Sequence, residues 1–392
     1  MHHSNQGAEP PEGGAPHDSG GAPPDQWPDE PPVSGSLPAG EPWSPEQRAA
    51  DPRGLVFWLV AVCAALAFSL LFGQVELGLL TAIGGMFAVA HASERDGRWT
   101  LLHTVLGWIP PAGAAVVFVA MAVWFANANL FADTPLPGAD RVAGIVLSVG
   151  AAVISLALLA DPVADRFAHL AFGTRQSGPV DRLGARFVAI SFLVAPPGWF
   201  FVQGLVATSQ LNQVAIGPGS FAGSMVGFTM LTLGAVGFPV RRGWRATAER
   251  LGLRRIGWPE VALIGAGLLA LVLLNAGMEW LSRAWFPRMY ARDQAMNELI
   301  AGRLTGFGTL MLGVSAGVGE ELAMRGALMP RLGLVATSLL FASLHVQYSP
   351  PGMVTIGMIG LLLGIIRKRG GTTSAIAVHV LYDILAALGA QH

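Results

Sequence analysis

Long apolar runs follow one another along most of this chain, from residue 54 onward. Each approaches the roughly 20 residues that a helix needs to cross a bilayer core about 30 Å thick. The pattern therefore predicts an all-α fold, a polytopic transmembrane helical bundle with roughly 11 spans and an error of about two. The predicted spans lie near residues 55–73, 75–92, 101–126, 142–160, 185–208, 220–240, 259–281, 304–323, 333–347, 353–366 and 371–389.

The first 52 residues do not follow this pattern. They hold 12 of the 27 prolines, seven glycines and nine acidic residues, against one basic residue, Arg48. A segment of this kind cannot bury enough apolar surface to offset the entropy lost on ordering. We expect residues 1–52 to be a disordered acidic tail, residues 53–256 to form N-terminal transmembrane helices, and residues 257–392 to form a C-terminal membrane domain.

Composition supports a membrane protein and excludes several other classes. Hydrophobic residues make up 52% of the chain and charged residues only 12%, against about 25% in soluble domains. A net charge of −1 offers no positive field for phosphates, so we expect no nucleic-acid partner. The single cysteine, Cys63, excludes an intrachain disulfide and a metal site built from cysteines. The lipid bilayer is the expected surrounding.

The distribution of basic residues predicts the orientation. With the N-terminus in the cytoplasm, 19 of the 24 basic residues fall in cytoplasmic segments, as the positive-inside rule requires. We therefore expect an integral protein of the cell membrane with a cytoplasmic N-terminus. The exception is segment 282–304, which has four arginines on the outer side. A helix lying on the membrane surface would explain them and would make this segment a lid or a lateral gate.

Ionisable residues gather in three apolar segments of the C-terminal third, "GVGEELAMRG", "LLFASLHVQ" and "AIAVHVLYDIL". Charged groups inside a bilayer are costly and usually functional. Because buried charges need partners, we expect the three segments to bring these groups into one site. The residues concerned are Glu320, Glu321, Arg325, His345, His379 and Asp383.

Helical spacing divides these residues into pairs. Glu321 and Arg325 are four residues apart, so they share a helix face and can form a structural ion pair. Glu320 is rotated by about 100° from Glu321 and can face elsewhere. The same four-residue spacing joins His379 to Asp383, and it places Phe341 one turn before His345, where its ring can wall the pocket of that imidazole.

These residue types suit the activation of water. No serine lies in a G-x-S-x-G turn and no cysteine lies in the cluster, which argues against a nucleophilic side chain. Glu320 could take a proton from water beside His345, while His379 and Asp383 could stabilise an oxyanion. Alternatively, Glu320, His345 and His379 could hold a zinc ion with one open position. We favour the metal-free mechanism slightly, because the chain lacks an H-E-x-x-H pair.

Two other classes of protein would also place charge in a membrane. A proton- or ion-coupled transporter could use the cluster as an ion site, but the chain shows no internal repeat of the transporter kind. A non-catalytic immunity or scaffolding protein could use it to bind a membrane partner, although intact motifs argue against this interpretation.

The three motifs resemble those of the CPBP family of intramembrane endopeptidases (CAAX proteases and bacteriocin-processing enzymes), also called the Abi family. The family pattern is E-E-x-x-x-R, then F-x-x-x-H, then H-x-x-x-[DN]. This chain has the motifs in that order at residues 320–325, 341–345 and 379–383. The resemblance covers about residues 257–388, which we therefore expect to be a protease domain.

The resemblance implies an endopeptidase that acts on a membrane-associated peptide or protein, similar to the type II CAAX prenyl endopeptidases. Those enzymes remove the last three residues of prenylated proteins and have Asn at the place of Asp383. The family has been called metalloprotease and glutamic protease by turns, so the resemblance leaves the metal open. It implies a structural or substrate-positioning pair, Glu321 and Arg325. It implies a catalytic set made of Glu320, His345, His379 and Asp383.

Overall fold

The computed structural model describes residues 52–128, 136–174, 176–207 and 217–391. The chain divides into two units, Met1–Glu41 and Pro42–His392, and every described residue belongs to the second. Helices account for the regular structure of these residues, and no strand occurs among them. The predicted all-α fold is confirmed. The predicted acidic tail lies outside the described residues except for Pro52.

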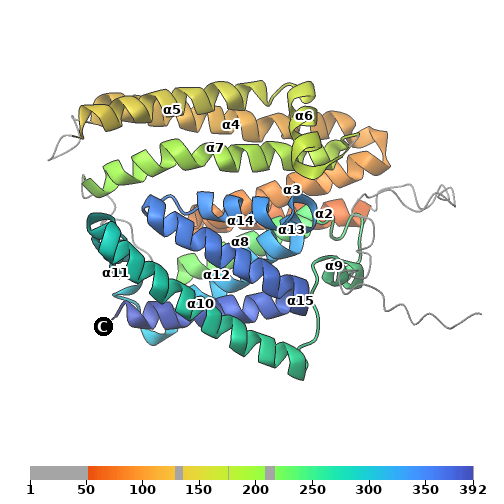
Figure 1. Ribbon diagram of the computed structural model, residues 1–392. Helices are drawn as coiled ribbons and strands as arrows, with labels where there is room; N and C mark the ends of the chain where they lie inside the picture. The colour runs from red at the N-terminus through yellow and green to blue at the C-terminus, as the bar shows by residue number, and fades with distance from the viewer. Residues whose placement is uncertain (1–51, 129–135, 175, 208–216, 392) are drawn as a thin grey trace, which may run out of the picture. The chain divides into compact units, whose positions relative to one another are not determined.

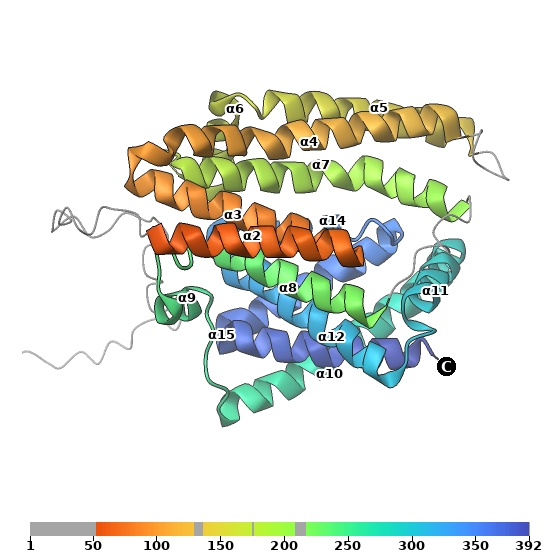
Figure 2. The same cartoon turned by 180° about the vertical axis from the view of Figure 1, so that it is seen from behind.

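Four helices pack together as one layer, which Figures 1 and 2 show along the top of the unit. Helix α4 packs against α5 and α7, and α7 also contacts α5 and α6. Phe118 of α4 is buried with Ala151 and Ala152 of α5, and Leu193 of α7 packs against them. The layer consists of α4 (Thr100–Asn127), α5 (Gly138–Ala157), α6 (Asp161–Phe172) and α7 (Pro179–Ala207).

Three further helices connect this layer to the C-terminal third. Helix α3 packs against α2, α8 and α7, and Figure 2 shows α2 lying along α3. Trp58 of α2 is buried and donates a hydrogen bond of 2.6 Å to the carbonyl of Phe238. The helices are α2 (Pro52–Phe72), α3 (Val75–Arg95) and α8 (Pro218–Ala235). The short helices η1 (Gly97–Trp99) and α9 (Trp244–Arg250) lie in the connections.

The C-terminal third packs around α12 and α15. Helix α12 contacts α8 on one side and α15 on another, and α15 also contacts α10 and α14. These elements are α10 (Trp258–Trp285), α11 (Pro287–Ala301), α12 (Gly306–Glu321), α14 (Leu334–Ser343) and α15 (Pro350–Gly389). Between α12 and α14 lie the π-helical segment η4 (Leu322–Leu328) and the short helix α13 (Met329–Leu332).

Helix α15 reverses its direction at Gly371. Its backbone there has φ 82°, a conformation that glycine adopts without steric cost. Leu363 and Ile366 before this position pack against Ala375 and Val378 after it, which a straight helix would not allow. The hydroxyl of Thr372 donates to the carbonyl of Leu251 at 2.6 Å and holds the reversal in place.

Seven helices of the described part of the chain are long and apolar enough to cross a membrane, and up to eight if a bent pair counts as one span. The seven are Pro52–Phe72, Val75–Arg95, Gly97–Asn127, Gly138–Ala157, Pro179–Leu205, Trp258–Trp285 and Pro350–Gly389. The bent pair is Pro287–Ala301 with Gly306–Leu332, and the bend measures 110°.

The predicted number of roughly eleven spans is not confirmed. Helix α14 has only 10 residues, about 15 Å at 1.5 Å per residue, which is half of the bilayer core. The predicted spans 353–366 and 371–389 are the two halves of α15. The predicted span 304–323 counts only together with α11, across the bend.

The predicted division of the chain at residue 256 stays a prediction. The helices on its two sides are in contact, because α8 packs against α12 and α7 packs against α14. Arg331, after η4, also forms an ion pair with Asp181 of α7.

Gly317 allows the close approach of α12 to α15. A Cβ atom at this position would lie 2.5 Å from Cγ2 and 2.7 Å from the backbone nitrogen of Val380. Gly317→Ala is therefore expected to push the two helices apart and to destabilise the fold by about 1–3 kcal/mol. Thermal unfolding in detergent, measured on the purified variant, checks this expectation.

Gly265→Ala is the matched control, since Gly265 lies in α10 and a Cβ there would meet no atom within 4 Å. Alanine favours a helix over glycine, so this variant should melt at or slightly above the wild-type temperature. Equal melting temperatures for Gly317→Ala and the wild type would contradict the close packing of α12 on α15.

Candidate active site

Three elements bring the predicted site residues together. The end of α12 and the segment η4 carry Glu320, Glu321 and Arg325, and the second half of α15 carries His379 and Asp383. Helix α14 and the turn after it carry the remaining motif, Phe341 and His345. Helix α15 contacts α12, η4 and α14. The π-helical winding of η4 is of a kind that occurs frequently at functional sites.

The carboxylate of Glu321 is the centre of the site. This residue is fully buried. Its Oε1 accepts a hydrogen bond of 2.7 Å from Nη1 of Arg325 and lies 2.9 Å from Nδ1 of His379. Its Oε2 has no hydrogen-bond partner among the described residues. The predicted contact between Glu321 and Arg325 is present, and Glu321 also links the first motif to the third.

His379 lies between two carboxylates. While Nδ1 faces Glu321, Nε2 lies 3.4 Å from Oδ2 of Asp383. An ionised carboxylate only accepts hydrogen bonds, so the contact with Glu321 requires a proton on Nδ1. This arrangement fixes the plane of the imidazole and directs Nε2 towards the side of the site where Asp383 lies.

Arg325 is buried with compensating contacts on each side. Only 1% of its side chain is exposed. Besides the ion pair with Glu321, its Nη2 donates to the carbonyl of Gly360 at 3.1 Å. Its guanidinium carbon also lies 4.6 Å from the ring centre of Phe341, a cation–π geometry. These contacts stabilise a charge that burial alone would make very costly.

Phe341 connects all three motifs. Besides the contact with Arg325, its ring lies edge-on to the imidazole of His345, with centroids 4.8 Å apart. The ring of His379 is also edge-on, with centroids 6.1 Å apart. The ring of Phe341 therefore packs against the His345 imidazole, as the four-residue spacing in the sequence predicted.

His345 is held through its own helix end. Its Nδ1 lies 2.8 Å from the carbonyl oxygen of Phe341. A carbonyl only accepts, so Nδ1 donates and Nε2 is left with a free lone pair. The backbone nitrogen of His345 donates to the carbonyl of Ala342, and its own carbonyl accepts from the nitrogen of Tyr348. His345 is thus part of a turn rather than of a helix.

Glu320 differs from the other acidic residues of the site. Its carboxylate forms no hydrogen bond and no ion pair with the described residues, and the residue is only half-buried. The charged groups that act on it include His379, Glu321 and Arg325. No hydrogen bond or ion pair joins Glu320 to His345 in the described part of the chain, and their joint action on one water molecule stays a prediction.

The three predicted metal ligands, Glu320, His345 and His379, are not arranged as a metal site in the structure. Among the described residues, no three side chains of His, Cys, Asp or Glu are grouped so that they could hold a metal ion. Glu320, His345 and His379 are no exception, and Nδ1 of each histidine already faces an oxygen of the protein. Zinc at this site stays a prediction.

Glu76 is an additional acidic residue near the site. It lies in the first turn of α3 and accepts a hydrogen bond from the hydroxyl of Ser224 in α8, the helix that packs against α12. Glu76 belongs to none of the three motifs. An acidic residue at the start of an apolar helix is a signal in the sequence, but its place beside the site depends on the packing of α3 on α8 and of α8 on α12.

Comparison with known proteins supports the resemblance. Residues 302–385 match a protein family described as type II CAAX prenyl endopeptidase Rce1-like. No curated protein and no solved structure matches the chain. The matched residues contain all three motifs. Together with the apolar helices, the match supports an integral membrane protein that is a protease of the CAAX type. The predicted resemblance is thereby confirmed: residues 302–385 are similar to the Rce1-like family of type II CAAX prenyl endopeptidases.

Proposed function

We propose that this chain is an intramembrane endopeptidase that removes C-terminal residues from membrane-associated peptides or proteins. The observation that carries the proposal is the meeting of three distant motifs around the contact between Glu321 and His379, where the carboxylate of Glu320 has no hydrogen bond or ion pair to any described residue. The similarity of residues 302–385 to CAAX prenyl endopeptidases supports this choice of substrate class.

In the proposed mechanism Glu320 is the general base. It removes a proton from a water molecule, and the hydroxide formed attacks the carbonyl carbon of the scissile peptide bond. His345 orients this water through Nε2, because its Nδ1 is occupied by the carbonyl of Phe341. Glu320 then returns the proton to the nitrogen of the leaving amine as the carbon–nitrogen bond breaks.

His379 stabilises the oxyanion in this mechanism. With Nδ1 directed to Glu321, a protonated Nε2 lies 3.4 Å from Oδ2 of Asp383 in the free enzyme. The oxyanion of the tetrahedral intermediate accepts a hydrogen bond from this Nε2. Asp383 thus orients His379, a role that a carboxylate can fill although it cannot itself donate to an oxyanion when ionised.

Mass spectrometry of the products tests the proposal. The purified protein in lipid nanodiscs is incubated with peptides ending in a prenylated CAAX sequence, and with the same peptides without the prenyl group. We expect release of the C-terminal tripeptide, faster from the prenylated peptide. Equal rates would show a broader endopeptidase. Failure to cleave any membrane peptide by folded protein would contradict the proposal and favour a non-catalytic binding protein.

Removal of metal ions is expected to leave this activity unchanged. The proposed mechanism uses only protein groups, and no group of three His, Cys, Asp or Glu side chains among the described residues is placed to hold zinc. The activity is measured after dialysis against a strong chelator, with the metal content of the same sample determined by mass spectrometry. A loss of activity that added zinc restores would show a metalloprotease instead.

We propose further that the protein lies in the cell membrane with its N-terminus in the cytoplasm. The support is the distribution of basic residues, 19 of 24 of which fall on one side of the predicted spans.

A further inference from the structure

The turn that carries His345 is fixed by side chains from helices that are distant from it in the sequence. Residues 344–349 join α14 to α15 without helical structure of their own. Inside the turn, backbone hydrogen bonds link His345 to Ala342 and to Tyr348. The contacts that fix the turn to the rest of the protein come from α11 and from α7. Neither helix carries a residue of the three motifs.

Asp293 of α11 makes the strongest of these contacts. Its Oδ1 accepts from the backbone nitrogen of Ser349 at 2.8 Å, and its Oδ2 accepts from the hydroxyl of Ser349 at 2.5 Å. Ser349 is fully buried and is the N-cap of α15, where its hydroxyl also accepts from the nitrogen of Gly352. A Cβ at Gly352 would lie 2.6 Å from Oδ2 of Asp293, so only glycine leaves room for the carboxylate.

Three further hydrogen bonds hold the same turn. The hydroxyl of Tyr348 donates to Oδ1 of Asn297 in α11 at 2.8 Å. The carbonyl of Tyr348 accepts from Nε1 of Trp199 in α7 at 3.0 Å. The carbonyl of Gln347 accepts from Nη2 of Arg292 at 3.4 Å. Three consecutive residues of the turn are therefore fixed by side chains from other helices.

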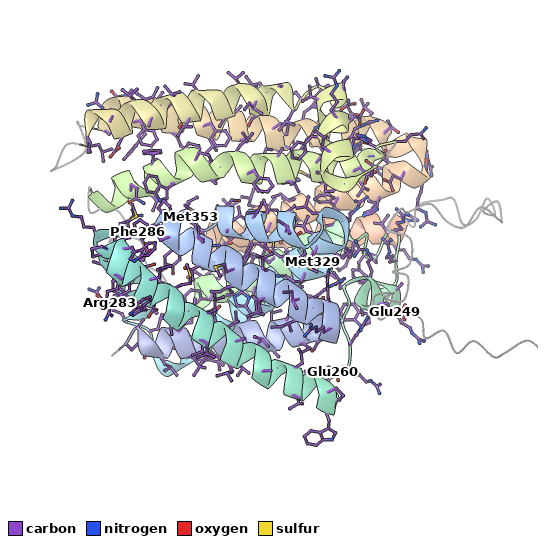
Figure 3. The ribbon with its side chains drawn as sticks, in the orientation of Figure 1. Glu249, Glu260, Arg283, Phe286, Met329 and Met353 are labelled. Carbon is purple, nitrogen blue, oxygen red and sulfur yellow. The ribbon has the colours of Figure 1, made fainter. Side chains whose placement is uncertain are left out.

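Helix α11 is itself anchored to the end of α10. Nη2 of Arg283 donates to the hydroxyl of Tyr290 at 2.8 Å, and the amide of Gln294 donates to the same oxygen at 2.7 Å. Figure 3 shows Arg283 and Phe286 at the end of α10 from which α11 starts. The amide of Asn297 donates to Gln294 and completes a chain of contacts to Tyr348.

We propose that Asp293 is a positioning residue for His345. It fixes Ser349 and the start of α15, and through them the turn in which the imidazole lies. The proposal rests on the proposed function, in which His345 orients the attacking water. It also assigns a role to the segment that the sequence marked as a lid: α11 holds the turn of the site in the conformation described here.

Loss of this contact should affect the reaction more than substrate binding. Without the carboxylate, the nitrogen and hydroxyl of Ser349 lose their acceptors, and the turn is free to shift. A displacement of a reacting group by about 1 Å can cost on the order of 100-fold in rate. Both carboxylate oxygens of Asp293 accept hydrogen bonds from Ser349, so we expect the carboxylate to take no part in substrate binding and KM to change little.

Steady-state kinetics of four variants test the proposal. Asp293→Ala is expected to lower kcat by about 100-fold with KM close to that of the wild type. Asp293→Asn keeps one acceptor oxygen and should restore most of kcat. Ser349→Ala removes only the hydroxyl contact and should lower kcat by an intermediate amount. It tests the same contact in case Asp293→Ala does not fold. The control is Glu298→Ala, an exposed carboxylate of α11 that makes no side-chain hydrogen bond in the described part of the chain, and it should behave as the wild type.

A double-mutant cycle separates positioning from general stability. If Asp293 acts through His345, then Asp293→Ala should have little further effect in a protein that already carries His345→Ala. Losses that multiply would show that Asp293 acts on the reaction by another route. They would overturn the proposal, as would a wild-type kcat in a folded Asp293→Ala protein.

Hydrogen exchange distinguishes this proposal from the proposed function. Amides of residues 344–353 should exchange faster in Asp293→Ala than in the wild type or in Glu298→Ala, whereas amides of α12 should not change. Unchanged exchange in the turn overturns the positioning role. A wild-type protein that cleaves no peptide contradicts the proposed function. In that case, faster exchange in Asp293→Ala would still show that Asp293 fixes the His345 turn. The proposed effect of Asp293 on catalysis would be overturned.

Discussion

Replacement of Glu320 by glutamine is expected to abolish peptide-bond hydrolysis while leaving the protein folded. Glutamine has nearly the same shape as glutamate but cannot take a proton from water. Loss of a general base costs about 10²–10⁴-fold in rate. Since the carboxylate of Glu320 has no partner among the described residues, its neutralisation breaks no ion pair. The measurement is kcat with the CAAX-type peptide, together with the melting temperature of the same sample.

Two other variants show whether this loss is specific. His379→Ala removes the proposed oxyanion donor and should cost about 10²–10³-fold, less than Glu320→Gln. Glu298→Gln changes an exposed carboxylate of α11 and should leave kcat unchanged. Full activity of Glu320→Gln would overturn both the metal-free and the zinc mechanism, because each needs this carboxylate at the reacting water.

The local part of the candidate site could be predicted from spacing alone. Residues four apart on a helix share a face, so the sequence indicated contacts between Glu321 and Arg325 and between His379 and Asp383. The structure has these pairs at 2.7 and 3.4 Å. The spacing rule holds even though Arg325 lies in the π-helical segment η4, since the four-residue neighbour remains within reach of a long side chain.

The long-range part of the site could not be predicted in the same way. Glu321 and His379 are 58 positions apart, and their contact depends on how closely α12 approaches α15. That approach is set by a glycine at position 317 opposite Val380, a detail that no periodicity reports. The placing of Glu320 and His345 at one water molecule stays a prediction: Glu320 has no hydrogen bond or ion pair among the described residues, and Nδ1 of His345 lies against the carbonyl of Phe341.

Residues of other helices that lie near the site could not be found from the motifs, for a related reason. Asp293 lies in a segment whose arginines drew attention to a lid, and Glu76 lies at the start of an apolar span. Neither belongs to a motif, and neither lies within the residues 302–385 that match the protease family. Their places near the site depend on the packing of α11 against the His345 turn and of α3 against α8, which is tertiary information.

The second large effect is expected from Arg325→Ala, which should destabilise the folded protein rather than act on catalysis alone. Removal of the guanidinium leaves Glu321 fully buried with His379 as its one remaining partner among the described residues, and it removes a donor from the carbonyl of Gly360. Breaking a buried pair from one side costs about 3–5 kcal/mol. The packing of the guanidinium against Phe341 is lost as well. We expect a lower yield of folded protein and a lower melting temperature.

Arg245→Ala is a matched control for this prediction. Arg245 pairs with Glu249 at the same four-residue spacing, but the two side chains are 95% and 69% exposed. An ion pair in water contributes little, because solvent screens it and both side chains lose entropy on pairing. The variant should therefore melt with the wild type, so that the difference between the two arginines reports burial and not spacing. If Arg325→Ala instead expresses and melts normally but cleaves no peptide, then Arg325 contacts the substrate, and a free C-terminal carboxylate of the peptide would be its natural partner.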